Sequence, residues 1–174
     1  AIPFAWTWLL SYSFFKDVPL PKINTDFLFW VILGGVLQII FTVLLIKLFS
    51  LRSFAAGTAF SKTEVLQATF FEALLIGTIV SLQVGFGIII GAIAIILLSI
   101  IKSKVTIRNL LKSLKTKQAA LGFASGAFLA ICSVAFRAAT DSLEGTDLIV
   151  KAGTTLSISV TLQTIVMGIW MQRY

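Results

Sequence analysis

Two residues of opposite charge, Lys62 and Glu64, stand close together inside the largely apolar stretch 54–77. At the centre of a membrane-spanning helix one charged side chain costs about 2.5–3.5 kcal/mol on insertion scales, so such residues persist where they face a bundle interior or a wet cavity. They do not face each other on a helix, so each needs a partner elsewhere. We expect Lys62 to bind an anionic or carboxylate group and Glu64 to carry a proton or bind a cation. A buried pair that only fixes helix packing is the alternative.

Uncharged polar residues extend this candidate substrate or ion pathway. Thr58 shares a helix face with Lys62, and Gln67 shares one with Glu64. Gln38 lies in the middle of another apolar run, where an amide needs a hydrogen-bonding partner. These side chains could line a substrate cavity, or they could only hold helices together by interhelical hydrogen bonds.

A second charged pair is predicted near the outer face of the membrane. Glu72 lies toward the end of the stretch 54–77, and Arg137 follows the apolar run 119–136. Both would stand at a similar depth, so they could pair across helices. Such a pair would be structural, or it would act as a gate that opens and closes.

Two GxxxG motifs predict close helix packing. Gly87 and Gly91 form the first, and Gly122 and Gly126 form the second. Small residues at this spacing allow two backbones to approach closely. Packing within one chain is the first reading, and a homodimer is the alternative.

The composition is that of a membrane protein. The 174 residues are 58% hydrophobic and only 12% charged, whereas soluble domains are about a quarter charged. Without histidine, the chain lacks the commonest general base and metal ligand, and its one cysteine, Cys132, allows no internal disulfide. No Walker A, GxGxxG, HExxH, CxxC or GxSxG motif occurs. We therefore predict a protein that is not an enzyme and needs neither metal nor cofactor.

The chain divides into apolar runs that predict an all-α polytopic bundle. A span needs about 20 residues, and β-barrel strands would alternate instead of running continuously. Trp6 and Trp8 could line a pore, although tryptophans near span ends usually form an aromatic belt. Six spans are predicted, the first incomplete: 1–15, 27–46, 54–77, 82–101, 119–136 and 152–172. The intervening segment 137–151 is predicted to be a polar loop.

Basic residues set the predicted orientation. The net charge of +7 concentrates in short loops, which favours a membrane partner over nucleic acid. Loops 47–53 and 102–118 collect most of the cations and are predicted to be cytoplasmic, in the inner membrane. The segment 102–118 has cations along one helix face and apolar residues opposite, as in a membrane-surface helix, although a solvated linker fits too.

Several stretches together resemble the EamA-like branch of the drug/metabolite transporter superfamily. After the basic turn KLFSLRS, FAAGTAFSKTEVLQATFFEALLIG is similar to that family's fourth helix and SLQVGFGIIIGAIAIILL to its fifth. LGFASGAFLAICSVAFRAAT is similar to the opening of the second repeat. The resemblance implies ten helices in two inverted repeats. The chain would then be an internal fragment with most of the first repeat in 1–101, a linker in 102–118 and the start of the second repeat in 119–174.

Three features depart from the family pattern. Lys62–Thr63–Glu64 stands where the family often has a proline, and Gly77–Thr78 stands where a glutamate often ends the helix. The loop between repeats is commonly outside, whereas the cations here place 102–118 inside. These departures indicate a distinct subgroup with its own substrate.

The resemblance implies a secondary transporter that exports small metabolites by alternating access. The coupling ion would be a proton carried by Glu64, in keeping with its position in an apolar stretch. Two rival functions are an intramembrane enzyme acting on lipid-linked substrates and a non-transporting membrane subunit. The lack of histidine disfavours the enzyme, and charges inside a span disfavour the subunit.

Overall fold

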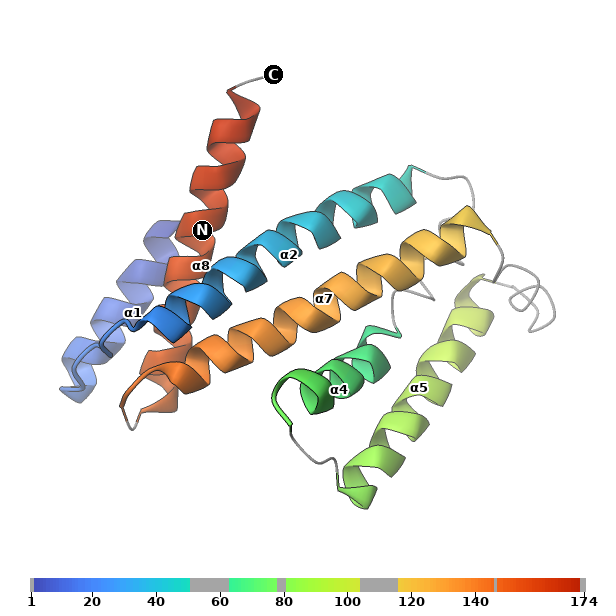
Figure 1. The fold of residues 1–174 in the computed structure, drawn as a ribbon, viewed down its shortest axis with the longest axis horizontal. Helices are drawn as coiled ribbons and strands as arrows, with labels where there is room; N and C mark the ends of the chain where they lie inside the picture. The colour runs from blue at the N-terminus through green and yellow to red at the C-terminus, as the bar shows by residue number, and fades with distance from the viewer. Residues whose placement is uncertain (1, 51–62, 78–80, 104–115, 146, 173–174) are drawn as a thin grey trace. The chain divides into compact units, whose positions relative to one another are not determined.

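The computed structural model describes residues 2–50, 63–77, 81–103, 116–145 and 147–172 as helices and short connections (Figure 1). No strand occurs within these ranges. The helices are α1 (Ile2–Lys16), α2 (Thr25–Phe49), α4 (Glu64–Leu75), α5 (Leu82–Ser103), α7 (Lys117–Ser142) and α8 (Leu148–Met171). The predicted all-α class is confirmed for the described residues.

Three of these helices are long and apolar enough to cross a membrane: α2, α7 and α8. In hydrocarbon every backbone polar group must be bonded internally, and a continuous helix achieves this. The chain thus has the make-up of a helical membrane protein. At 15 and 12 residues, α1 and α4 are shorter than the roughly 20 residues that a span needs. The number of spans and the ten-helix repeat stay predictions.

The polar segment 137–151 is more helical than the sequence predicted. Helix α7 continues to Ser142, and α8 begins at Leu148. One reason is that Arg137 and Asp141 stand one turn apart on α7, with Nε and Oδ2 separated by 3.8 Å. Another is that the Asp147 carboxylate accepts the first free backbone N–H groups of α8, from Ile149 and Val150. The loop is therefore shorter than 137–151.

The stretch 54–77 also differs from its prediction. Helix α4 begins at Glu64, so this residue stands in a first helical turn and not near the middle of a helix. One local property favours a start there, since a carboxylate in the first turn is stabilised by the positive end of the helix dipole. The Thr63 side chain makes no capping hydrogen bond. Residues 54–62, which include Thr58 and Lys62, lie outside the described residues, as does most of the predicted linker 102–118.

The chain forms two compact units, and each is described separately. Unit 1 comprises Ala1–Val36 with Ala135–Tyr174, and unit 2 comprises Leu37–Val134. Unit 1 therefore holds α1, the beginning of α2, the end of α7, and α8. Unit 2 holds α4, α5 and the remaining parts of α2 and α7. The predicted division at 101 and 118 follows sequence repeats and stays a prediction.

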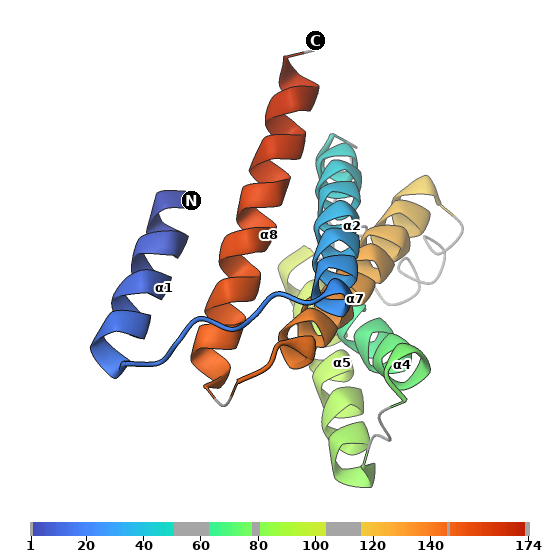
Figure 2. The ribbon, with the colours of Figure 1, turned by 60° about the vertical axis from the view of Figure 1, so that its left-hand side comes forward.

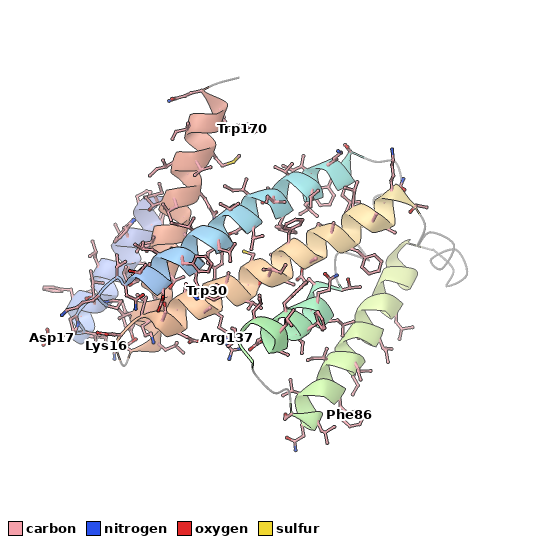
Figure 3. All side chains as sticks on the ribbon, viewed as in Figure 1. Lys16, Asp17, Trp30, Phe86, Arg137 and Trp170 are labelled. Atoms are coloured by element: carbon pink, nitrogen blue, oxygen red, sulfur yellow. The ribbon has the colours of Figure 1, made fainter. Side chains whose placement is uncertain are left out.

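The core of unit 1 lies where the beginning of α2 meets the end of α7. Phe27 and Val31 of α2 pack with Ala139 and Leu143 near the end of α7, and all four are buried. Trp30, labelled in Figure 3, packs against this cluster. Further partly buried side chains around it are Phe136, Ile158 and Leu162. This cluster joins α2, α7 and α8 within unit 1.

Asn24 fastens the start of α2 to the end of α7. Its Oδ1 accepts the backbone N–H of Phe27 at 2.7 Å, which caps α2. Its Nδ2 donates to the carbonyl oxygen of Ser142 at 2.6 Å, near the last turn of α7. One side chain thus bonds a free donor and a free acceptor at two helix ends.

Helix α1 packs along α8 (Figure 2). The contact is closest at Gly153, where an added Cβ would lie 3.0 Å from atoms of Leu9 and Trp8. Leu9 is fully buried in this contact region. A residue without a side chain at position 153 thus lets the two helices approach.

Candidate functional site

Polar side chains are buried around α8, a helix long and apolar enough to span a membrane. We call the following residues the hydroxyl row: Thr154, Thr155, Ser157, Ser159 and Thr161. The first four are at most 5% exposed. Buried hydroxyls need hydrogen-bonding partners, and in helices they usually find one in the preceding turn.

Most of the hydroxyl row bonds to its own helix. Thr154, Thr155 and Thr161 donate to the carbonyl oxygens of Val150, Lys151 and Ser157, at 2.8, 3.0 and 2.7 Å. Ser159 donates to Leu156 at 3.0 Å. Because these bonds stay within α8, they can form regardless of which element packs against this helix.

Two members of the row also bond to other helices of unit 1. The hydroxyls of Thr155 and Thr140 are 3.0 Å apart, which joins α8 to the end of α7. The indole Nε1 of Trp6 donates to the Thr161 hydroxyl at 3.1 Å, which joins α1 to α8. Trp6 therefore bonds to α8, and its predicted place in a pore or in an aromatic belt stays a prediction.

Ser157 is the exception in the row. It is fully buried, and its Oγ has no hydrogen-bond partner among the described residues. A buried polar atom without a partner forfeits the hydrogen bonds that it would make in water, so it requires an explanation. The position of this atom is taken up below.

In unit 2, the described part of the predicted pathway centres on the start of α4. Glu64 is half-buried in its first turn. The Gln67 side-chain amide donates to the Thr63 hydroxyl at 2.8 Å and reaches the Phe123 carbonyl oxygen at 3.5 Å, a long contact. The second distance brings Gln67 of α4 close to α7 within this unit. Whether these residues bind a solute stays a prediction.

Gln38 lies half-buried in α2, in the part that belongs to unit 2. Its carbonyl oxygen accepts the hydroxyl of Thr42 at 2.8 Å, an ordinary bond to the next helical turn. The alternatives of cavity lining and interhelical bonding therefore both stay predictions.

The predicted outer pair, Glu72 and Arg137, lies in two different units. Glu72 is half-buried in α4, whereas Arg137 is exposed on α7 and approaches Asp141. Both side chains of that approach are more than half exposed, so water screens it and its contribution to stability is small. The role of Glu72 and Arg137 as a pair or gate stays a prediction.

The two GxxxG motifs differ in their surroundings. A Cβ added to Gly87 or Gly91 of α5 would meet no described atom within 4 Å. Gly122 and Gly126 of α7 are buried. Burial at α7 agrees with packing within the chain, while the open α5 motif leaves the homodimer alternative as a prediction.

The described residues also include few groups that could hold a metal. Within them, no group of three or more His, Cys, Asp or Glu residues comes together. Cys132 is buried in α7 as a free thiol.

The sequence analysis missed the hydroxyl row and the link from Trp6 to Thr161. A signal was present in TTLSISVT, where five of eight residues carry a hydroxyl inside an otherwise apolar run. Serine and threonine satisfy themselves within a helix, so this pattern by itself does not distinguish packing from binding. The contact with α1 is what makes the row distinctive.

The comparisons with known proteins give no match: no family model, no curated protein and no solved structure is similar to this chain. The resemblance to EamA-like transporters therefore rests on the quoted stretches alone. The proposals below rest on the geometry of the described residues and on the chemistry of their side chains.

Proposed function

We propose that this chain belongs to a secondary transporter that moves small polar metabolites across a membrane by alternating access. The observation that carries the proposal is the hydroxyl row of α8, buried inside a helix long enough to span. Serine and threonine also serve close packing of membrane helices, so the flux experiment below decides between packing and binding. Hydroxyls that bond their own helix can exchange those bonds for bonds to a passing solute without leaving a polar group unpaired.

The charged residues at the start of α4 would supply the driving ion. Glu64 is half-buried beside a helix terminus, and Lys62 precedes it closely in the chain. A carboxylate that alternates between two environments can bind a proton on one side and release it on the other. In this proposal Ser157 and Thr161, the members of the hydroxyl row that share the face toward α1, contact the solute, and Glu64 carries the proton.

The test is flux through the protein reconstituted in proteoliposomes with an imposed pH gradient. Amino acids and other small metabolites are screened for gradient-driven uptake and efflux. We compare Glu64→Gln and Lys62→Met with the wild type. Glu64→Gln keeps the size and hydrogen-bonding capacity of the side chain but cannot exchange a proton, so we expect gradient-driven flux to be abolished while exchange of solute across the membrane continues.

Glu144→Gln is the matched control, because Glu144 is exposed in the connection between α7 and α8. It should transport as the wild type does. Unchanged gradient-driven flux in folded Glu64→Gln and Lys62→Met would show that these charges are structural. No flux of any solute in the wild type would refute the transport proposal itself.

A further inference from the structure

We infer that the Ser157 hydroxyl anchors a small uncharged polar group at the seam between α1 and α8. The seam is the contact formed by Gly153, Ser157 and Thr161 on α8 with the facing residues Trp6, Trp8 and Leu9 on α1. The inference deepens the proposed function and rests on it for the idea that the bound group is a transported solute. Binding at the seam can nevertheless be tested without transport.

The first step is the behaviour of Ser157 within its own helix. Thr154, Thr155, Ser159 and Thr161 all donate to a carbonyl oxygen of the preceding turn. Ser157 has the same option and does not use it. Because the side chain is fully buried, bulk water does not compensate. Its hydroxyl is not bonded to its own helix, so it is available to a group that enters the seam.

The second step is the position of Ser157 between two different contacts. One turn before it, Gly153 brings α8 within 3.0 Å of Trp8 and Leu9, measured from the position of an added Cβ. One turn after it, Thr161 accepts a hydrogen bond from the Trp6 indole. Residues four apart share a helix face, so Ser157 also faces α1. The orphan hydroxyl thus lies between an apolar contact and a polar one.

The third step is the absence of charge along the seam. In the described parts of α1 and α8, the only charged side chains are Lys16, at the end of α1, and Lys151, in the first turn of α8. Lys151 is about 9 Å from Ser157 along the helix axis. A charged ligand at Ser157 would lose its hydration without a counter-ion from α1 or α8 beside it, since both lysines lie toward helix ends. The seam therefore suits a neutral hydroxyl, amide or carbonyl group.

The test uses thiol reactivity, because a methanethiosulfonate reacts with a hydrated thiolate and not with a thiol in a dry contact. Ser157→Cys and Ser159→Cys are each placed in a Cys132→Ala background and reconstituted without any gradient. Ser159 is the matched control, being buried on the same helix with its hydroxyl already bonded. The reagents are methyl methanethiosulfonate and its cationic trimethylammonium-ethyl and anionic sulfonatoethyl analogues.

With the uncharged reagent we expect Ser157→Cys to react at least about tenfold faster than Ser159→Cys. Both charged reagents should react with Ser157→Cys at least about tenfold more slowly than the uncharged one. Acetamide in excess should slow the labelling of Ser157→Cys, and acetate should not. Equal labelling at the two positions would mean that the seam is dry packing. Equal labelling rates for charged and uncharged reagents would contradict the inference that the seam binds a neutral group.

A second measurement does not depend on a thiol at position 157. Acetamide should raise the unfolding temperature of the wild type and of Ser159→Ala, and this rise should be lost in Ser157→Ala. An unchanged response in Ser157→Ala would overturn the site. The transport proposal and the binding proposal can fail separately. Selective labelling of Ser157→Cys without any flux would refute transport and support the binding site. Flux without selective labelling would refute the binding site alone.

Discussion

Unit 1 and the α4–α5 pair of unit 2 have similarly apolar sequences, yet their side chains differ in burial and in hydrogen bonding between helices. In unit 1 the core at Phe27 is fully buried, and Asn24, Trp6 and Thr140 form hydrogen bonds between helices. In α4 no residue is buried, and large apolar side chains of α5 such as Phe86 are exposed. Figure 3 labels Phe86 on α5.

This difference indicates that apolar residues serve two purposes in the chain: packing against other helices and contact with an apolar surrounding. In the buried core of unit 1, side chains pack against particular neighbours, as the tight contact between Gly34 and Phe136 shows. On α4 and α5, the exposed side chains need only match an apolar surrounding such as lipid. Substitutions should therefore be costly in the first region and mild in the second, and the predictions below test that contrast.

The largest effect is expected from removing a core aromatic ring. Phe27→Ala should lower the free energy of unfolding by about 3–5 kcal/mol, because a fully buried ring leaves a cavity that its neighbours fill only partly. Unfolding in detergent micelles, followed by tryptophan fluorescence, measures the change. Phe86→Ala is the matched control, since its ring is 65% exposed, and it should stay within about 0.5 kcal/mol. Equal losses in the two variants would remove the contrast between the regions.

A smaller loss is expected from one added methyl group on α2. In Gly34→Ala the Cβ would lie 2.8 Å from ring atoms of Phe136, closer than such contacts allow, so we expect a loss of about 1–3 kcal/mol. In Gly35→Ala the Cβ would meet Gln163 Cγ at an ordinary 3.8 Å.

Because both changes bring the same helix propensity, their difference isolates the collision with the ring. Thermal unfolding of the two variants side by side gives that difference. Phe136→Leu combined with Gly34→Ala should recover part of the loss, as a double-mutant cycle would show. Equal stability of the two alanine variants would indicate that the ring moves aside freely.

The two hydrogen bonds of the Asn24 side chain should contribute less to the free energy of unfolding than the core contacts do. Asn24→Ala removes the cap of α2 and the donor to the Ser142 carbonyl, and we expect a loss of about 1–2 kcal/mol. Asn24→Asp keeps an oxygen that can accept the backbone N–H of Phe27 but lacks the donor to Ser142. Its stability should therefore fall between those of Asn24→Ala and the wild type. Chemical unfolding of the three proteins measures the order. An Asn24→Asp variant as unstable as Asn24→Ala would assign the whole effect to the Ser142 contact.

The smallest effect is expected on α5. Gly87→Ala places its Cβ where no described atom lies within 4 Å, so stability should change by no more than about 0.5 kcal/mol, toward greater stability because alanine favours a helix. Thermal unfolding at several protein concentrations measures this. A marked loss of stability in Gly87→Ala that depends on protein concentration would show that Gly87 packs against a second copy of the chain. In that case α5 would no longer differ from unit 1 in its sensitivity to substitution.

Much of the fold could be predicted from the sequence. The apolar runs around α2, α7 and α8 were identified because a helix that spans hydrocarbon needs both length and a continuous apolar composition. Helix ends were less accurate. The α7 helix extends past Arg137 because arginine and the following Ala138 and Ala139 are good helix formers, and a count of consecutive apolar residues stops at the charge.

The candidate site was harder to predict. Glu64 and Gln67 were found because charged and amide groups are conspicuous in apolar sequence. Ser157 was not, because serine is common in membrane helices and usually bonds its own turn. Nothing in the local sequence distinguishes Ser157 from Ser159, yet the Ser159 hydroxyl donates to Leu156 and the Ser157 hydroxyl has no partner among the described residues.

The sequence by itself determined that this chain is helical and suited to a membrane, since both properties follow from the length and composition of each run. Only the tertiary structure decided which polar groups of the described residues bond across helices and that the Ser157 hydroxyl among them has no partner. Trp6 and Thr161 are remote in the chain, and they bond because Gly153 lets α1 approach α8. Hydrogen bonds act over a few ångströms, so the partner of a buried hydroxyl depends on that packing and not on its neighbours in sequence.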